Sequence, residues 1–263
     1  MPFVQSYQRW QQFQFLEKEF YPAIKMNSEA AKGIDDLAAA YRQSVLGDDA
    51  VLMEQTQPKC KPFGKRLLIS SELFQTFKKE NCHLITSDID EFTETGIRCK
   101  NGEYVDLDCV VFCTGFRSQE FLCSIRDGVW GKNGVNLQRD VWNTNDCFAY
   151  LGITVSGFPN LFMLYGPGTN LGSNSVLFMI ECAVDYTVQC IELMMKNWWN
   201  EVDVKRDVMQ KFVKDLDEEN SKNAWQDPNI TNWYKNDKGS KRGSTNWAYS
   251  CYYYWWLTSS VNA

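Results

Sequence analysis

The sequence predicts an α/β protein, and three observations support this fold class. Residues 5–46 carry apolar side chains at helical spacing. Short apolar runs bounded by Gly, Pro and Asn follow, and such runs are typical of strands. Residues 157–199 then combine an apolar run, a Gly/Pro turn and a long helical pattern, which together predict a strand–turn–helix unit.

The composition is that of a globular protein. The chain has 263 residues, of which 44% are hydrophobic and 23% charged, enough for a sizeable core and one or two domains. A net charge of -6 argues against a nucleic-acid-binding surface. We see no 18-residue apolar span and no signal peptide, and therefore expect a soluble, cytoplasmic protein without a membrane span.

Ten cysteines and one histidine limit the possible chemistry. No two cysteines form a Cys-x-x-Cys pair, so we expect most of them to be small buried hydrophobic residues rather than disulfides or metal ligands. This expectation applies to Cys60, Cys82, Cys109, Cys113, Cys182 and Cys190. The single histidine, His83, excludes a His-rich metal site, and we predict no metal centre.

The N-terminal half is expected to contain two helices and then several strands. Pro22 and Ser28 mark the break between the helices. Short strands are expected at Leu67–Ser70 and Cys82–Thr86, with a helix over 71–79 between them. A three-stranded meander is expected over 88–107, where Asn101-Gly102 is a strong hairpin signal. The apolar run Cys109–Cys113 predicts a central strand buried on both faces, which ends at Thr114-Gly115-Phe116.

The C-terminal half is expected to be built on two helices. After a loop-rich stretch over 124–147, residues 157–165 predict a buried strand that leads through a Gly/Pro turn into a helix over 174–199. A polar helix is expected over 203–220. The tail from 225 is aromatic and is expected to be irregular, including its run Tyr252–Trp256.

The glycine pattern Gly166-x-Gly168-x-x-x-Gly172 has more than one interpretation. It could be a dinucleotide-phosphate loop, with Asp185 at the distance of a ribose-binding acid, although the spacing is one residue longer than in the standard fingerprint. It could equally be a structural turn that needs glycine for positive φ. A third interpretation comes from a family resemblance.

Five segments, in order, resemble motifs of flavin-containing monooxygenases, in particular the Baeyer–Villiger type. They are PFGKRLLIS at 62–70, NCHL at 81–84, DCVVFCTGF at 108–116, GFPNLFMLYGPGTNLGSNS at 157–175, and NWY at 232–234. The resemblance covers roughly residues 1–245. It implies FAD and NADPH as cofactors and oxygen insertion beside a ketone as the reaction, typically in specialised metabolism.

The resemblance also implies functional residues. Arg66 matches the family's catalytic arginine, with Lys65 beside it; an arginine suits a site where negative charge develops, because it is always charged and offers a planar fork of donors. Without the resemblance, both would be read as solvated loop charges. The residues implied to bind cofactor are Thr114, Gly115, Gly166, Pro167, Gly168, Thr169, Asn170 and Trp233. Trp233 would contact the nicotinamide, or would be a core aromatic residue. Family members often carry histidine where Ser173 stands here.

The two glycine fingerprints that hold FAD and NADPH in this family are not found in the sequence. We therefore expect a partial two-dinucleotide-binding-domain flavoprotein (Rossmann-like) fold with helical additions. Residues 1–57 would be a helical segment from the nicotinamide side, 58–123 the end of the NADP-type domain and the return strand, and 124–263 the C-terminal FAD-domain remnant and cap. We expect this chain alone to bind FAD weakly or not at all.

Three functions remain open at this stage. The chain could be a shortened member, or a partial gene product, of a Baeyer–Villiger-type monooxygenase. It could be a flavin-free pseudo-oxygenase that performs a cyclisation, isomerisation or lactonisation. It could also be a non-catalytic partner of a larger flavoprotein, or a homo-oligomer, joined through an exposed sheet edge.

Overall fold

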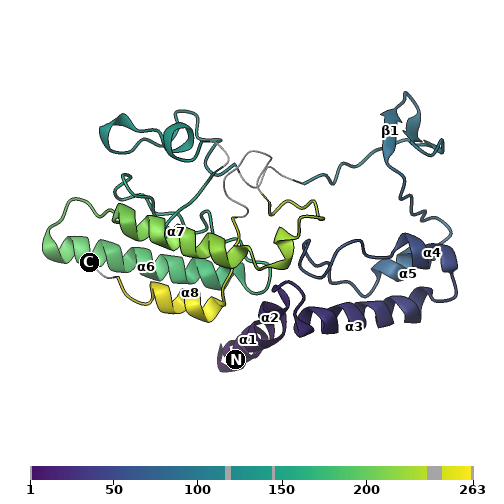
Figure 1. The fold of residues 1–263 in the computed structure, drawn as a ribbon, viewed down its shortest axis with the longest axis horizontal. Helices are drawn as coiled ribbons and strands as arrows, with labels where there is room; N and C mark the ends of the chain where they lie inside the picture. The colour runs from purple at the N-terminus through teal and green to yellow at the C-terminus, as the bar shows by residue number, and fades with distance from the viewer. Residues whose placement is uncertain (1, 116–119, 144–145, 236–244, 262–263) are drawn as a thin grey trace. The chain divides into compact units, whose positions relative to one another are not determined.

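The computed structural model describes residues 2–115, 120–143, 146–235 and 245–261 (Figure 1). The chain divides into two compact units. The larger unit comprises residues 1–35, 60–67 and 118–263, and the smaller one comprises 36–59 and 68–117. The long helix α3 (Glu29–Leu46) begins in the larger unit and ends in the smaller.

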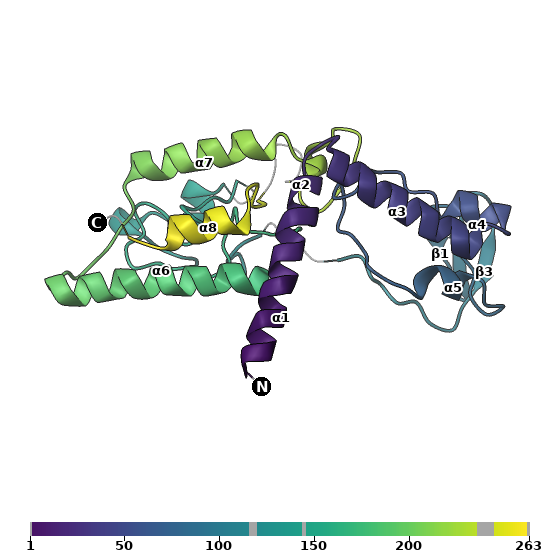
Figure 2. The same cartoon turned by 90° about the horizontal axis from the view of Figure 1, so that it is seen from below.

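The larger unit is mainly helical. At its N-terminus, α1 (Pro2–Phe15) continues through a π-helical turn, η1 (Leu16–Phe20), into the short α2 (Tyr21–Ala23). Its other helices are α6 (Val176–Asn197), α7 (Arg206–Asn220) and α8 (Cys251–Thr258), together with the short turns η2 (Lys132–Gly134), η3 (Leu137–Val141) and η4 (Ala224–Gln226). Figure 2 shows α8 lying alongside α6.

The smaller unit contains the only sheet among the described residues. Its strands β1 (Ile89–Phe92), β2 (Gly96–Cys99) and β3 (Tyr104–Asp106) form an antiparallel meander in the order β1-β2-β3. Gly96 pairs with Asp106 and Arg98 with Tyr104 across the second hairpin. Gly102 adopts φ +88°, which only glycine reaches without strain, so the Asn-Gly turn forms where the sequence predicts it. Two short helices, α4 (Ala50–Gln55) and α5 (Leu73–Phe77), complete this unit.

The hydrophobic core lies in the larger unit. One cluster packs the inner face of α6 against α8, with Met179, Tyr186 and Tyr254 at its centre. A second surrounds the fully buried Trp142, and a third surrounds Trp225 near the end of α2. The core face of α6 follows from its sequence, because Met179, Cys182, Ala183, Tyr186 and Cys190 recur at helical spacing.

The helices expected from the sequence are confirmed, as is the meander. Of the two residues expected to mark the helix break, Pro22 lies in the short α2 and Ser28 directly precedes α3. The helices expected over 71–79, 174–199 and 203–220 are α5, α6 and α7. Within the tail expected to be irregular, residues Cys251–Thr258 instead form α8, where Ser250 caps the helix by accepting a hydrogen bond from the N–H of Tyr253 at 3.1 Å.

The short strands expected at Leu67–Ser70 and Cys82–Thr86, and the buried strands expected at Cys109–Cys113 and 157–165, are wrong. None forms a strand, and Val111 and Phe112 are 79% and 67% exposed. A strand forms only where a neighbouring strand supplies its hydrogen bonds, and the described residues provide no such neighbour for these segments. The expectation that the cysteines are buried is confirmed for Cys182 and Cys190. It is wrong for Cys109 and Cys113, which are exposed because the strand expected at 109–113 does not form. All ten cysteines are free thiols.

Candidate functional site

The Gly/Pro turn at 166–170 is the centre of the candidate site. Gly168 adopts φ +87°, and a Cβ on Gly166 would lie 2.4 Å from the carbonyl oxygen of Gly152, so both positions require glycine. The buried Thr169 closes the turn by donating from its hydroxyl to the Gly166 carbonyl at 2.7 Å. The turn does not lie at the helix N-terminus as expected: α6 begins only at Val176, capped by Ser175.

A C-terminal segment, residues 245–249, forms hydrogen bonds with the backbone of this turn. The carbonyl of Thr245 accepts from the N–H of Gly168 at 2.9 Å and from that of Asn170 at 3.4 Å, and the N–H of Trp247 donates to the Asn170 carbonyl at 2.9 Å. The side-chain amides of Asn170 and Asn246 are joined at 2.6 Å. Two amides that a phosphate would need are therefore engaged within the chain, which argues against the phosphate-loop interpretation.

Arg66, which lies far earlier in the chain in the segment 60–67, contacts the residue that follows this turn. Its Nη1 donates to the carbonyl of Leu171 at 3.1 Å, one residue beyond Asn170. The residue as a whole stays exposed, so this hydrogen bond orients the guanidinium without removing it from solvent. Lys65 is exposed as well. The structure therefore brings Arg66 together with the turn at 166–170.

Two tyrosines flank this guanidinium. Burial raises the pKa of the Tyr234 hydroxyl, while the charge of Arg66 and a hydrogen bond with it act in the opposite direction. Burial also raises the pKa of Tyr165, and the Leu171 N–H and the charge of Arg66 again oppose it. Both groups are therefore neutral near pH 7, and Tyr165 donates to the Asn170 side-chain oxygen at 2.7 Å. Neutral hydroxyls do not themselves compensate the charge of Arg66.

Asn232 connects the loop of Arg66 to the aromatic pair that follows it. Its side-chain amide donates to the carbonyl of Gly64 at 2.9 Å, and its oxygen accepts from the N–H of Tyr234 at 2.9 Å. The rings of Trp233 and Tyr234 lie 4.4 Å apart. Tyr234 is buried, whereas Trp233 is 46% exposed, so its side chain lies partly at the surface.

Thr114 and Gly115 belong to the smaller unit, whereas Arg66 and the turn at 166–170 belong to the larger one. Both are exposed, and Gly115 adopts φ +87°. Phe116, the last residue of that motif, lies outside the described residues. Of the residues predicted as cofactor ligands, the structure therefore assembles those of the turn with Arg66 and Trp233, all within the larger unit.

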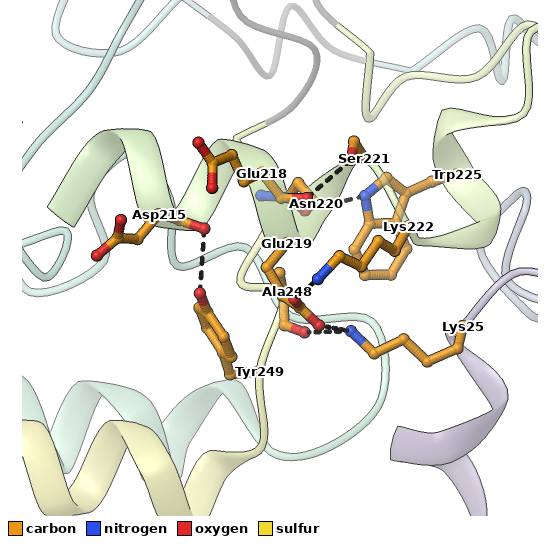
Figure 3. Close-up of polar contacts among 10 residues, drawn as sticks. All are labelled: Lys25, Asp215, Glu218, Glu219, Asn220, Ser221, Lys222, Trp225, Ala248 and Tyr249. Carbon is orange, nitrogen blue, oxygen red and sulfur yellow. Dashed lines mark hydrogen bonds and ion pairs between the residues drawn. The ribbon is translucent and has the colours of Figure 1, made fainter. Parts of the chain in front are cut away.

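The C-terminal segment is anchored by polar contacts at the end of α7 (Figure 3). Lys25 Nζ donates to Glu219 at 2.5 Å and to the Ala248 carbonyl at 3.3 Å. The Tyr249 hydroxyl donates to the Asp215 carbonyl at 3.1 Å. Asn220, whose side-chain oxygen accepts from Trp225 Nε1 at 3.1 Å, donates from Nδ2 to the Asn246 carbonyl at 2.8 Å. These contacts fix the segment that reaches the glycine turn.

Sequence reasoning missed Tyr165, Asn232, Tyr234 and Thr245. Tyr234 and Asn232 lie in the quoted NWY motif, so their position was visible although their partners were not. No local pattern pointed to Thr245, because a carbonyl that bonds a turn some 75 residues earlier in the chain leaves no sequence signal. Among the described residues, no group of three or more His, Cys, Asp or Glu side chains is placed to hold a metal ion.

Comparison with known proteins shows that monooxygenases are relatives of this chain. It is 31% identical over 227 residues to the uncharacterized monooxygenase y4iD of Sinorhizobium fredii, covering 85% of this chain and 34% of that protein. It is 31% identical over 232 residues to the FAD-binding monooxygenase ktnD of Aspergillus niger, covering 87% and 37%. A Baeyer–Villiger monooxygenase of Pseudomonas aeruginosa is 33% identical over 170 residues, covering 65% and 32%. No protein-family model matches the chain.

Solved structures of the same group share the fold. The OTEMO complex with FAD and NADP matches with a TM-score of 0.75 at 20% identity, covering 95% of this chain and 48% of that one. Oxidized steroid monooxygenase bound to NADP matches with a TM-score of 0.74 at 21% identity, covering 95% and 49%.

The fold is thus that of part of a flavoprotein monooxygenase, with a small antiparallel sheet in one unit and a helical core in the other. The chain belongs to the flavin-containing monooxygenase superfamily, in the group that includes the Baeyer–Villiger enzymes. It spans between about a third and a half of the length of the proteins it matches. Within the described residues, no helix has the length and apolar character needed to cross a membrane.

Proposed function

We propose that this chain carries the arginine-bearing part of an FAD- and NADPH-dependent monooxygenase that inserts oxygen beside a ketone. The observation that carries the proposal is the exposed Arg66 guanidinium, oriented by the Leu171 carbonyl beside the turn at 166–170. A fixed, water-accessible cation stabilises negative charge that develops on a substrate oxygen, and its geometry is set before the reaction. The specialised-metabolism setting and the ketone substrate are parts of this proposal.

The residues present fit one part of a flavin–nicotinamide site. An exposed indole on Trp233 offers a stacking surface, and Arg66 offers charge-assisted donors. Thr114, Gly115 and the turn Gly166–Asn170 would approach the cofactor through their backbones. Bound FAD, reduced by NADPH, would supply the oxygen-transfer chemistry, and Arg66 would hold positive charge at its guanidinium. The amides of Gly168 and Asn170 are already engaged, so phosphate binding is assigned to other parts of the enzyme.

Spectroscopy tests the proposal first. We expect the visible absorption band of FAD to change on addition of the purified chain, with weak affinity, and Arg66→Ala to weaken that change further. Arg66→Lys keeps the charge but not the fork of donors, and should recover it only partly. NADPH oxidation in the presence of cyclic ketones then tests catalysis. An FAD spectrum that stays unchanged in the presence of folded protein would contradict cofactor binding by this chain alone.

A second candidate function is a non-catalytic partner that completes its fold on a larger flavoprotein. The exposed apolar segments favour it: Ile69 is 80% exposed, and Val111 and Phe112 are exposed to a similar degree. Extended segments of this composition are typical of strands that pair on both sides. Co-purification of this chain with a flavin-containing monooxygenase would support this role, and turnover by the chain alone would contradict it. A flavin-free pseudo-oxygenase would instead turn over a substrate with neither FAD nor NADPH present.

A further inference from the structure

The dipeptide Asn101-Gly102 lies at the tip of the β2–β3 hairpin. The N–H of Cys99 donates to the Glu103 carbonyl at 2.8 Å, which closes a loop of three residues between the two strands. Within this loop the N–H of Gly102 donates to the Cys99 carbonyl at 2.9 Å. Asn101, Gly102 and Glu103 are all exposed. The hairpin therefore presents an amide side chain and the nitrogen of a glycine to water at the same place.

The side chain of Asn101 is folded over the peptide that follows it. Its Oδ1 accepts from the N–H of Glu103 at 3.1 Å, and its Nδ2 donates to the Glu103 carboxylate at 3.4 Å. The Gly102 nitrogen belongs to the ring of atoms that the first hydrogen bond closes, so the Cγ of Asn101 is held on the side of this nitrogen. A Cβ on Gly102 would meet nothing within 4 Å, so no neighbouring group shields this backbone position.

Both contacts with Glu103 favour attack of the Gly102 nitrogen on the Cγ of Asn101. The N–H bonded to Oδ1 stabilises the negative charge that develops on this oxygen during attack. The carboxylate beside Nδ2 is placed to accept a proton and return it to the leaving nitrogen. One contact opposes the reaction, because the hydrogen bond from Gly102 to Cys99 must open. Opening an exposed hairpin loop requires little free energy, so this contact slows the reaction without preventing it.

Asn133-Gly134, in the larger unit, is the same dipeptide in a different setting. Both residues are exposed, as at the hairpin, and both have positive φ, 59° and 69°. Within the part of the chain that the structure describes, the Asn133 side chain has no hydrogen-bond partner, so nothing holds its Cγ near the following nitrogen. A difference in reactivity between the two sites therefore reports the folded geometry and not the dipeptide.

We propose that Asn101-Gly102 is a site of intramolecular deamidation. The Gly102 nitrogen forms a bond to the Cγ of Asn101, and Nδ2 leaves as ammonia with the proton that the Gly102 nitrogen loses, which gives a cyclic succinimide. Water then breaks one of the two C–N bonds that the ring shares. Cleavage on the side-chain carbonyl gives aspartate, and cleavage on the main-chain carbonyl gives isoaspartate. The net reaction consumes one water and releases one ammonia, and it is independent of the proposed oxygenation.

The reaction changes the hairpin that carries it. Either product places a second carboxylate beside that of Glu103, and like charges this close repel each other. Isoaspartate also adds a methylene to the main chain inside the loop, which moves Gly102 away from its hydrogen bond with Cys99. The hairpin is therefore the place where this chain ages. An isoaspartyl residue in an exposed loop is in turn a substrate for enzymes that methylate its free carboxylate.

Peptide mapping by mass spectrometry tests the proposal on the purified, folded chain after incubation near neutral pH. We expect conversion at Asn101 to be at least about tenfold faster than at Asn133, because only the first side chain is held over the attacking nitrogen. In concentrated urea the two dipeptides lose their folded surroundings and should react at nearly equal rates. A methyltransferase specific for isoaspartate should label the peptide that contains residue 101. Equal rates in the folded chain, or faster conversion at Asn133, would overturn the proposal.

Two variants separate the part of Glu103 from its backbone N–H. Glu103→Gln keeps the N–H that bonds Oδ1 but removes the carboxylate that handles the proton, so conversion at Asn101 should slow several-fold. Glu94→Gln is the matched control, since it removes the same charge at an exposed position between β1 and β2 of the same sheet, and it should leave the rate unchanged. Circular dichroism verifies that both variants are folded. An equal effect of the two variants would overturn the role assigned to Glu103.

Discussion

One buried carboxylate, Glu17, links three helices of the larger unit. Its Oε1 accepts from the side-chain amide of Asn174, just before α6, at 2.7 Å, and from the N–H of Cys251, the first residue of α8, at 3.1 Å. Glu17 itself lies in the π-helical turn after α1. Glu17→Ala leaves two largely enclosed donors without their acceptor, and should lower the free energy of unfolding by about 2–3 kcal/mol.

Urea unfolding followed by circular dichroism measures this loss. Glu17→Gln retains one acceptor oxygen and should lose less than Glu17→Ala. Glu19→Ala, two residues along the same turn and exposed, is the matched control and should change stability by less than about 0.5 kcal/mol. If Glu17→Ala behaves like Glu19→Ala, the carboxylate does not hold the three helices together.

The glycine turn makes a second prediction at the residue scale. In Gly166→Ala the new Cβ would lie 2.4 Å from the Gly152 carbonyl oxygen, so the backbone must shift, and we expect a loss of about 1–3 kcal/mol. Gly33→Ala in α3 meets nothing within 4 Å and should stabilise the chain by about 0.5–1 kcal/mol. Thermal unfolding of the two variants should therefore shift in opposite directions, and equal shifts would show that the turn relaxes without strain.

At the scale of elements, the end of α7 responds to acid. Burial alone would raise the pKa of Glu219, but hydrogen bonds from Lys222 and Lys25 bring it below its ordinary value. A carboxylate with a lowered pKa in the folded state contributes stability above its unfolded pKa of about 4.3, and this contribution is lost as the pH falls through the folded value. Lys25→Met should therefore cost about 1 kcal/mol at pH 7 and progressively less towards about pH 3.

Urea titrations of wild type and Lys25→Met at several pH values check this expectation. Lys222→Met, whose side chain is more exposed, should have a smaller effect with the same pH trend. A difference between wild type and Lys25→Met that does not change with pH would mean that the hydrogen bond from Lys25 to the Ala248 carbonyl, not the ion pair, carries its contribution.

The longer helices were predictable from this sequence, whereas α8 and the long-range pairings were not. The periodicity of α6 and α7 and the breaks near Pro22 and Ser28 are local signals, and so is the Asn-Gly hairpin. The run at Cys109–Cys113 has the composition of a buried strand, but a strand forms only where a neighbour supplies hydrogen bonds. Similarly, motif order pointed to Arg66 and Trp233, whereas the contacts of Tyr165 and Tyr234 depend on the folded chain.

At the scale of the whole molecule, burial is unevenly distributed between the two units. The three hydrophobic clusters of described residues all lie in the larger unit. The smaller unit has a three-stranded sheet and a few buried residues such as Leu46 and Cys99, while Leu68, Ile69 and Val111 are exposed. Because hydrophobic burial is the main favourable contribution to folding, the smaller unit is expected to open at a lower free energy than the larger.

Hydrogen exchange measured by mass spectrometry resolves this difference by segment. We expect peptides from 68–117 to exchange at least about tenfold faster than those from α6, whose amides lie next to the core. Peptides spanning β2 and β3 are an internal control, since their ladder hydrogen bonds should slow exchange relative to the extended segments at 67–70 and 109–113. Strong protection of those two segments would require a covering surface in solution, and a loss of that protection on dilution would identify the cover as another chain, because only an intermolecular contact depends on concentration.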